Sequence, residues 1–414
     1  MSLRLAPTLA LLLPMLSPLQ AAPAPASPQA YHVYFGTYTN AKTESQGIYR
    51  SRLDLITGRL SPAELAAPAK DPAFLALHPN GKFLYALDES SDPKRTPTTG
   101  LSAYAINPAT GALTLLNQQT PGGPGPCHLA VDATGQTLLV ANYSGGSVSA
   151  ISLQPDGRLG ALSSVVKHTG ASVNPGRQKA PHAHGIYFAP DHRFAFAPDL
   201  GIDRVVGYRV APATAQLTLI QSGTGVPPVG SQSGMGVPPM SVTPGTHLPP
   251  GSGPRHLTFH PTGKFVYVIN ELLCTMTAFT YESAAGTLTS IQTVSTLPPG
   301  EAVPKGTSTA EVQVHPNGKF LYGSNRGANT LVVYTIDEKT GQLTYLENVS
   351  TLGQTPRHFA LDPTGTWLLA ENQDSSTVAV FRVDPKSGRL TPNGPLVAVP
   401  APVAAVFVPA LPTR

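Results

Sequence analysis

Short runs of alternating hydrophobic and polar residues recur in pairs along most of this chain. In "HLTFHPTGKFVYVINE", which runs from His256 to Glu271, two such runs flank a Pro-Thr-Gly turn. The alternation predicts strands with one buried face, and the tight turn between them predicts a β-hairpin. Six stretches share this pattern, and their turns are anchored at Pro79, Ala133, Pro190, Pro261, Pro316 and Pro363.

A second kind of hairpin fills the intervals between these turns. Its own turn carries Thr-Gly or Ser-Gly, as in "VVYTIDEKTGQLTYL" from Val332. Two hairpins in each period of about 50 residues make a four-stranded antiparallel unit, and radial repetition of such units makes a β-propeller. A seventh unit is divided between the two ends of the chain, "YHVYFGTYT" (31–39) and "PVAAVFVPA" (402–410). The sequence therefore predicts an all-β fold over residues 31–410, a seven-bladed β-propeller with four-stranded antiparallel blades. Pairing of the N- and C-terminal strands would close the ring and leave no exposed sheet edge.

One interval between turns is longer than the others because it contains an insert. Residues 222–250 hold a duplicated sequence rich in Pro and Gly, "SGTGVPPV" at Ser222 and "SGMGVPPM" at Ser233. This segment has no strand pattern. We therefore expect a surface loop there.

The N-terminus has the features of a secretory signal peptide. Arg4 precedes an apolar run, residues 5–16, and small residues follow from Ala21. A membrane anchor is the alternative, but the run is short and contains two prolines. We expect residues 1–22 to be a signal peptide and 23–30 a linker, and the mature protein to be periplasmic or secreted.

Composition excludes several other classes of protein. The formal net charge is +4 over 414 residues, and the basic residues are scattered, so no nucleic-acid-binding surface is indicated. After the N-terminal run, no stretch is hydrophobic for long enough to span a bilayer, and we expect a soluble monomer. Cys127 and Cys274 are the only cysteines. One disulfide between them is possible, but two buried free thiols are the favoured interpretation.

Alignment of the six hairpins separates repeated positions from variable ones. An Asn or Asp recurs near the end of every second strand, so its role is structural. Recurring histidines are likewise expected to be structural, namely His78, His260 and His315 in the turns and His128, His256 and His358 in the first strands. Two variable positions lie at the end of each hairpin opposite its tight turn, and four consecutive units place there His184, Arg255, Glu271, Arg326 and Arg357. If the first strand of each hairpin is the innermost, these side chains converge on one mouth of the central channel.

Each of these residues also has a simpler interpretation. Arg255 and Glu271 could form only an ion pair across their hairpin, although three arginines exceed what one glutamate neutralises and suit an anionic substrate. His182 and His184 form an H-x-H pair that could hold a metal ion on a strand, but the surplus of arginine disfavours a cation. No metal or cofactor is therefore expected. The chain has no G-x-S-x-G nucleophile motif, so covalent serine catalysis is not expected either.

Several motifs together resemble the seven-bladed lactonase propeller family, which contains bacterial 6-phosphogluconolactonases and fungal carboxymuconate lactonising enzymes. They are "YFGTYT", "GPxH", "PHAHG", "DLGxDR", "GPRHLTFHPTGKFVYVINE" and "SNRG", and the resemblance extends over 31–409 apart from the insert. It implies that the catalytic groups are His184, Arg255, Glu271 and Arg326. We further expect the substrate to be bound by Arg357, His182, Tyr143 and Arg177.

The resulting hypothesis is hydrolysis of a sugar-derived lactone to the open acid. An incompletely exposed histidine titrates near neutrality, whereas arginines on both sides of Glu271 should lower its pKa. We therefore favour His184 as the base, with Glu271 orienting the water or an arginine. The pathway that uses the phosphorylated lactone is cytosolic, whereas this chain is expected to be exported. The substrate could therefore be 6-phosphogluconolactone or a non-phosphorylated aldonolactone. The alternatives are a muconate-type lactonising cycloisomerase, a calcium-dependent gluconolactonase and a non-catalytic propeller that binds a ligand or protein.

Overall fold

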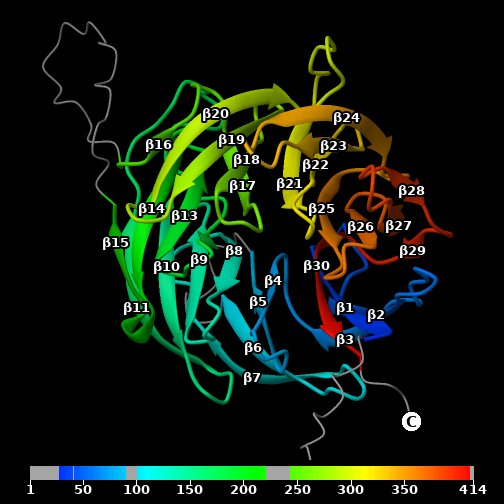
Figure 1. Cartoon of the computed structure of the whole chain (residues 1–414). Helices are drawn as coiled ribbons and strands as arrows, with labels where there is room; N and C mark the ends of the chain where they lie inside the picture. Colours follow the sequence, from blue (N-terminus) through cyan, green and yellow to red (C-terminus); the bar gives the residue numbers. More distant parts are fainter. Residues whose placement is uncertain (1–27, 41, 90–99, 221–242, 411–414) are drawn as a thin grey trace, which may run out of the picture.

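Seven antiparallel sheets stand in a ring around a central channel (Figure 1). This computed structural model describes residues 28–40, 42–89, 100–220 and 243–410. Four strands form the main path of every sheet, and two sheets have a short fifth strand. The predicted seven-bladed propeller is confirmed. In the part of the chain that is described, no helix is long and apolar enough to cross a membrane.

The blades follow one another in chain order around the ring. The closing blade consists of β1 (Ala30–Thr37), β2 (Gly47–Asp54), β3 (Glu64–Pro68) and β30 (Pro402–Pro409). The next two consist of β4 (Leu75–Leu77), β5 (Phe83–Leu87), β6 (Leu101–Ile106) and β7 (Leu113–Gln119), and of β8 (Pro126–Val131), β9 (Thr137–Asn142), β10 (Ser147–Leu153) and β11 (Leu159–Lys167). The fourth consists of β12 (Tyr187–Phe188), β13 (Phe194–Asp199), β14 (Arg204–Ala211), β15 (Gln216–Leu219) and β16 (Thr246–His247), with a 3-10 turn at Pro212–Thr214.

Three further blades complete the ring. The first consists of β17 (Pro254–Phe259), β18 (Phe265–Asn270), β19 (Thr275–Glu282) and β20 (Thr287–Ser295). The second consists of β21 (Ser308–Val314), β22 (Phe320–Arg326), β23 (Thr330–Ile336) and β24 (Leu343–Ser350). The third consists of β25 (Pro356–Leu361), β26 (Trp367–Asn372), β27 (Thr377–Val383), β28 (Leu390–Pro392) and β29 (Val397–Ala398).

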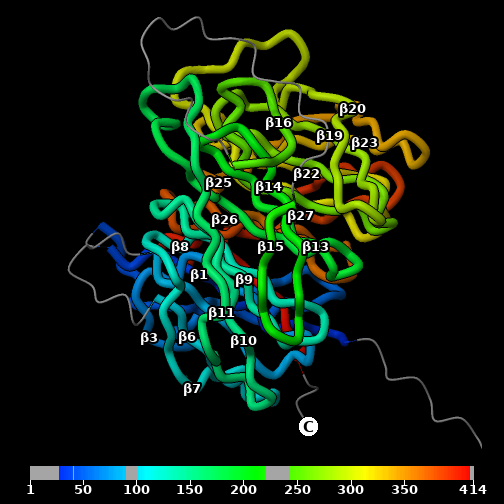
Figure 2. Tube along the Cα trace, turned by 90° about the vertical axis from the view of Figure 1, so that its left-hand side faces the viewer, coloured from blue at the N-terminus to red at the C-terminus, as the bar shows by residue number. Residues whose placement is uncertain are grey.

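The first strand of each predicted hairpin lies at the channel. Each of β4, β8, β12, β17, β21 and β25 is at the end of its sheet and contacts a strand of the neighbouring blade, and β30 has this place in the closing blade (Figure 1). The view turned by 90° has strands of two adjacent blades, β10, β11, β14 and β15, nearest the viewer (Figure 2). The first strands are therefore innermost, the arrangement that the variable positions need in order to converge on one mouth of the channel.

The ring closes where the two ends of the chain pair. β1 runs antiparallel to β30, with Tyr31 opposite Pro409 and Phe35 opposite Ala405, as predicted from the divided unit. Trp367 of β26 packs against this blade, and its Nε1 donates to the Leu55 carbonyl (3.0 Å). The indole of the only tryptophan in the chain therefore lies at the junction between the last blade and the closing blade.

Glycine in the turn of the second hairpin lets the preceding blade pack closely. At Gly341 the backbone has φ +72°, a conformation that costs side chains with a Cβ, and a Cβ there would lie 2.4 Å from the Phe265 ring. The Gly341 carbonyl also accepts a hydrogen bond from Tyr267 Oη (3.0 Å). The same arrangement joins Phe320 and Tyr322 to a glycine of the next blade. These turns therefore connect neighbouring blades as well as strands.

The repeated polar residues are structural, as predicted. His260 Nε2 and His315 Nε2 each lie 2.8 Å from a glycine carbonyl of the following blade. Asn270 Nδ2 donates to Thr275 Oγ1 (2.9 Å) and Thr277 Oγ1 (3.0 Å), which links the second strand of its sheet to the third. These bonds satisfy buried polar groups between strands and blades.

Three further predictions concern the N-terminus, the insert and the two cysteines. The signal peptide expected over 1–22 and most of the linker lie outside the described residues. Only 243–250 of the insert are described, and there Thr246–His247 pairs with β14, so the expectation of a strandless loop is wrong at this end. Cys127 and Cys274 are both buried free thiols, which confirms the favoured interpretation.

Candidate functional site

Glu271 is the centre of the predicted site. It follows β18 directly, and only 4% of its side chain is exposed. Arg326 Nη2 and Arg255 Nε lie 3.1 Å and 3.2 Å from Glu271 Oε2. Arg177 Nη2 donates to Oε1 (2.8 Å), and His184 Nε2 lies 3.9 Å from Oε2. The four residues predicted to be catalytic are therefore brought together, and Arg177 joins them from the loop between β11 and β12.

The histidines of "PHAHG" are positioned differently from the expected H-x-H pair on a strand. Asp199 Oδ1 accepts from the backbone N–H groups of His182 (2.7 Å) and Gly201 (2.9 Å), and only an isolated bridge joins Ala183 to Asp199. The first strand of this blade therefore begins at Tyr187, after both histidines. The placement of the two histidines on a strand was wrong. The Asp199 side chain, rather than a backbone carbonyl, accepts the hydrogen bond of the His182 N–H.

Tyr143 connects the two histidines at the rim of the site. Its ring stacks on His182 (centroids 4.4 Å apart) and meets His184 edge-on (5.1 Å). Its hydroxyl accepts from Arg177 Nη2 (3.1 Å), and 43% of the Arg177 side chain is exposed. The predicted substrate-binding residues Tyr143, His182 and Arg177 therefore form one cluster beside Glu271, and Arg177 is its solvent-facing member.

The surroundings lower the pKa of both candidate bases, for different reasons. Burial alone raises the pKa of Glu271, but the positive charges around it, Arg326 foremost, lower it well below its usual range, as predicted. Burial, followed by the charge of Arg255, lowers the pKa of His184 well below its ordinary value. The expectation that a partly exposed His184 titrates near neutrality is therefore wrong. Its imidazole is buried, which favours the neutral form, and among the described residues its Nδ1 has no hydrogen-bond partner.

Arg357 belongs to a second charged cluster. Its Nη2 lies 3.6 Å from Glu89 Oε1, and its guanidinium lies over the Tyr38 ring, 5.3 Å from the centroid. Tyr38 Oη donates to Glu89 Oε2 (2.6 Å). Neither Glu89 nor Tyr38 was among the predicted site residues. Glu89 occupies a variable position of the hairpin alignment, which was a usable signal, whereas Tyr38 lies in the divided unit, which has no turn motif to align.

A small cavity opens between Arg255 and Arg357. Its walls also include Glu89, Cys127 and the rings of Phe74, His256 and His358. Around it, the four arginines 177, 255, 326 and 357 face the carboxylates of Glu89 and Glu271 in the ion pairs of the described residues. This excess of positive charge suits an anionic group or a developing oxyanion.

Aromatic and imidazole rings meet in the channel. Each belongs to the residue that directly follows a variable position on the first strand of a hairpin. Phe74 contacts His128 (4.2 Å between centroids), His358 (5.9 Å) and His256 (6.1 Å), which come from different blades. His128 Nδ1 accepts from the Ile186 N–H (3.3 Å), and His256 Nδ1 lies 2.8 Å from Glu311 Oε2. His128 and His256 therefore contact residues of the next blade, in keeping with their expected structural role.

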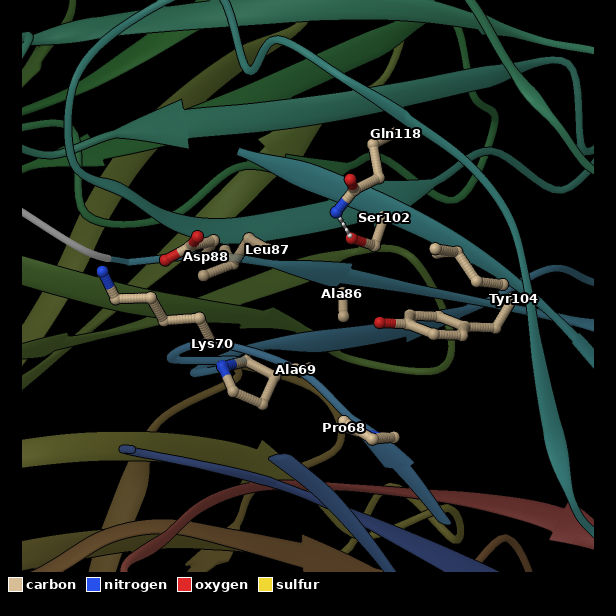
Figure 3. A pocket seen from close by; sticks show the side chains of 11 residues that line it. Pro68, Ala69, Lys70, Ala86, Leu87, Asp88, Ser102, Tyr104 and Gln118 are labelled. Atoms are coloured by element: carbon tan, nitrogen blue, oxygen red, sulfur yellow. Dashed lines mark hydrogen bonds between the residues drawn. The ribbon is translucent and has the colours of Figure 1, made fainter. Parts of the chain in front are cut away.

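Another groove lies away from this site. It is lined by Lys70, Asp88, Ser102, Tyr104 and Gln118, and Gln118 Nε2 donates to Ser102 Oγ (3.0 Å) (Figure 3). None of the predicted site residues is among those that line it. The Glu271 cluster is therefore the candidate active site.

Comparison with known proteins identifies the family. The sequence profile described as "Lactonase, 7-bladed beta-propeller" matches residues 32–407. A 6-phosphogluconolactonase of Bacillus subtilis is 35% identical over 332 residues, which cover 80% of this chain and 85% of that protein. A 6-phosphogluconolactonase of Formosa agariphila is 30% identical over 333 residues, 80% of this chain and 86% of that protein. The solved structure of a periplasmic gluconolactonase from Pseudomonas aeruginosa is 31% identical with a TM-score of 0.79, and the match covers 92% of this chain and all of that one (100%). The chain therefore belongs to the seven-bladed β-propeller lactonase family.

Proposed function

We propose that this protein hydrolyses a sugar-derived lactone to the open acid in the pocket around Glu271. One observation carries the proposal, namely the convergence of Arg177, Arg255 and Arg326 on a buried carboxylate beside the neutral imidazole of His184. A neutral imidazole can accept a proton, and fixed guanidinium groups can stabilise negative charge. Lactone hydrolysis needs both.

In the proposed reaction, water attacks the carbonyl carbon of the lactone. His184 accepts a proton from the water while Arg255 and Arg326 stabilise the negative charge that forms on the carbonyl oxygen. The bond between the carbonyl carbon and the ring oxygen then breaks, and His184 returns the proton to that oxygen. The product is a hydroxy acid, which ionises and releases one proton to solution.

Glu271 is the weaker candidate for the base. Its oxygens contact three guanidinium groups, which stabilise the charged carboxylate and make it a poor proton acceptor, whereas the pKa of His184 is lowered chiefly by burial. We assign it the role of holding these arginines in place or orienting the water. No metal takes part in the proposed reaction, because a cation would be repelled by the surplus of arginines, and activity should survive EDTA.

Arg357 and Arg177 are proposed to bind the remainder of the substrate. Both lie near the cavity or its rim, and each retains an exposed portion, 19% and 43% of the side chain. With Tyr143 and His182, they suit hydroxyl groups and an anionic substituent. The 6-phosphate of gluconolactone and the unphosphorylated sugar lactone are both compatible with this set.

We also propose that the protein acts outside the cytoplasm as a monomer. The N-terminal pattern of Arg4, an apolar run and small residues supports export, as does the likeness to a periplasmic gluconolactonase. Fractionation of cells that express the full chain, with size-exclusion chromatography of the mature protein, tests both points. Recovery in the cytoplasm with the N-terminus intact would contradict export.

The test of function is proton release from gluconolactone and from its 6-phosphate, measured in parallel against spontaneous hydrolysis. His184→Gln should lower kcat by about 100-fold or more, since general base catalysis contributes on that scale. Arg326→Met should also lower kcat, whereas His247→Gln, a substitution of an exposed histidine on β16, should not. Full activity of the His184 variant would refute its role as base. No turnover of either lactone by the wild type would refute the proposed hydrolysis and favour a cycloisomerase or a binding propeller.

A further inference from the structure

Arg255 touches a second buried histidine and, through it, a second carboxylate. Its Nη1 donates to the Ala310 carbonyl (2.7 Å) and lies 3.2 Å from His256 Nε2. His256 Nδ1 lies 2.8 Å from Glu311 Oε2. All three side chains are buried, and Glu311 comes from β21 of the next blade. A chain of contacts therefore runs from Glu311 through His256 and Arg255 to Glu271.

The two contacts of His256 specify one tautomer. A guanidinium can only donate hydrogen bonds, so His256 Nε2 must accept from Arg255 and carries no proton. The proton of the neutral ring is then on Nδ1, where it is donated to the carboxylate of Glu311. Either contact alone would favour the Nδ1–H form, and the two agree. A proton on Nε2 would instead face the guanidinium donor.

We propose that His256 and Glu311 are positioning residues that fix Arg255 for lactone hydrolysis by holding His256 in its Nδ1–H tautomer. Glu311 accepts the Nδ1 proton, and the Nε2 lone pair then orients the Arg255 guanidinium with its Nε toward Glu271. The catalytic part of this inference rests on the proposed function, whereas the tautomer does not.

The surroundings of Arg255 explain why it needs such support. The guanidinium is buried, and its Nε makes no well-aligned hydrogen bond to any described residue although Glu271 Oε2 lies 3.2 Å away. Its orientation is therefore set by the acceptors at Nη1, the Ala310 carbonyl and His256. A group that stabilises an oxyanion must be held to within about 0.5 Å, and neighbouring hydrogen bonds provide that precision.

The same carboxylate also faces another imidazole. Glu311 Oε2 lies 3.6 Å from His358 Nε2, and His358 Nδ1 lies 2.8 Å from Glu371 Oε2. Glu371 is therefore a second buried carboxylate in contact with His358, and it makes no direct hydrogen bond with His256. This difference provides a matched control for Glu311.

The first measurement is nitrogen NMR of the imidazole groups in the unliganded wild-type protein, with the His256 signal assigned from His256→Gln. The Nδ1–H tautomer is expected. Glu311→Leu should weaken that preference, because only the contact with Arg255 then favours Nδ1–H, and lower kcat by about 10- to 100-fold, the scale of one hydrogen bond to a charged group. KM should change much less. Glu371→Leu, the matched control, should leave the His256 tautomer unchanged.

If Glu311→Leu does not fold, two variants of His256 test whether this residue positions Arg255. His256→Gln retains an acceptor that can reach Arg255, whereas His256→Leu has none, so the glutamine variant should keep the higher kcat. An Nε2–H tautomer in the wild type, or equal kcat in the two His256 variants, would overturn the positioning role. Absence of lactone hydrolysis together with an Nδ1–H tautomer would refute the proposed function and leave the inferred geometry of His256 intact.

Discussion

Substitution of Glu271 by glutamine should destabilise the protein measurably. Glutamine preserves the shape but leaves the buried Arg255 and the partly exposed Arg326 without the carboxylate that lies 3.2 Å and 3.1 Å from them. Loss of one partner of a buried ion pair costs about 3–5 kcal/mol. The propeller has about 350 described residues, and unfolding entropy is about 2.1 cal/mol/K per residue. The melting temperature should therefore fall by about 4–7 °C.

The same substitution should change the acid sensitivity of the fold. The pKa of Glu271 is lower in the folded protein than the value of about 4.3 in an unfolded chain, so the folded state binds this proton less readily. Its contribution to stability is present above about pH 4.3 and is lost as the pH falls further. Glu271→Gln lacks this contribution, so its stability should decline less steeply below about pH 5.

Thermal unfolding followed by circular dichroism and by fluorescence of Trp367 provides the assay. The indole lies at the junction with the closing blade, so its emission reports on the closure of the ring. Glu338→Gln is the control, because that glutamate is exposed in the turn between β23 and β24. A loss of less than about 1 °C at pH 7, or an acid response identical to that of the wild type, would refute the electrostatic reasoning.

Two further predictions concern the blade interfaces and the rim. Gly341→Ala should lower the free energy of unfolding by about 2–4 kcal/mol in urea titrations, since it combines a positive φ with a clash against Phe265. Gly300→Ala shares the positive φ, but no atom of the described residues lies within 4 Å of the added Cβ, so it should cost less, and equal losses would contradict the packing argument. Arg177→Met should lower kcat/KM about tenfold for the phosphorylated lactone and less for gluconolactone, because it removes an exposed positive charge beside Glu271. Parallel initial rates on the two substrates check this, and equal losses would show that Arg177 does not discriminate by charge.

The periodicity of the chain was sufficient to predict the architecture. The turns of the first hairpins and the glycines of the second hairpins recur because every blade must pack against its neighbours in the same way. The variable positions identified His184, Arg255, Glu271 and Arg326 because the scaffold does not need those residue types. Ring closure was also predictable, since an unpaired strand at each end of the chain would leave exposed edges.

Local patterns did not predict contacts between distant segments. The sequence has no periodic signal for Arg177, which reaches Glu271 from 94 positions away, or for Tyr38, which bonds to Glu89 across 51. The H-x-H pair was placed on a strand because alternation there resembles the other repeats, yet the Asp199 side chain accepts the hydrogen bond of the His182 N–H. The repetition of His256 correctly indicated a structural role but did not reveal its contact with Arg255.

The sequence by itself determined the seven blades, their closure and the residue types at the mouth, because these follow from local alternation, turn chemistry and repetition. Only the tertiary structure decided how deeply Glu271 and His184 are buried, which arginines share one carboxylate, and which groups contact the two ring nitrogens of His256. Burial and the distances between charges depend on how all the blades pack around the channel. They set the pKa values on which the chemistry depends, and no single repeat encodes them.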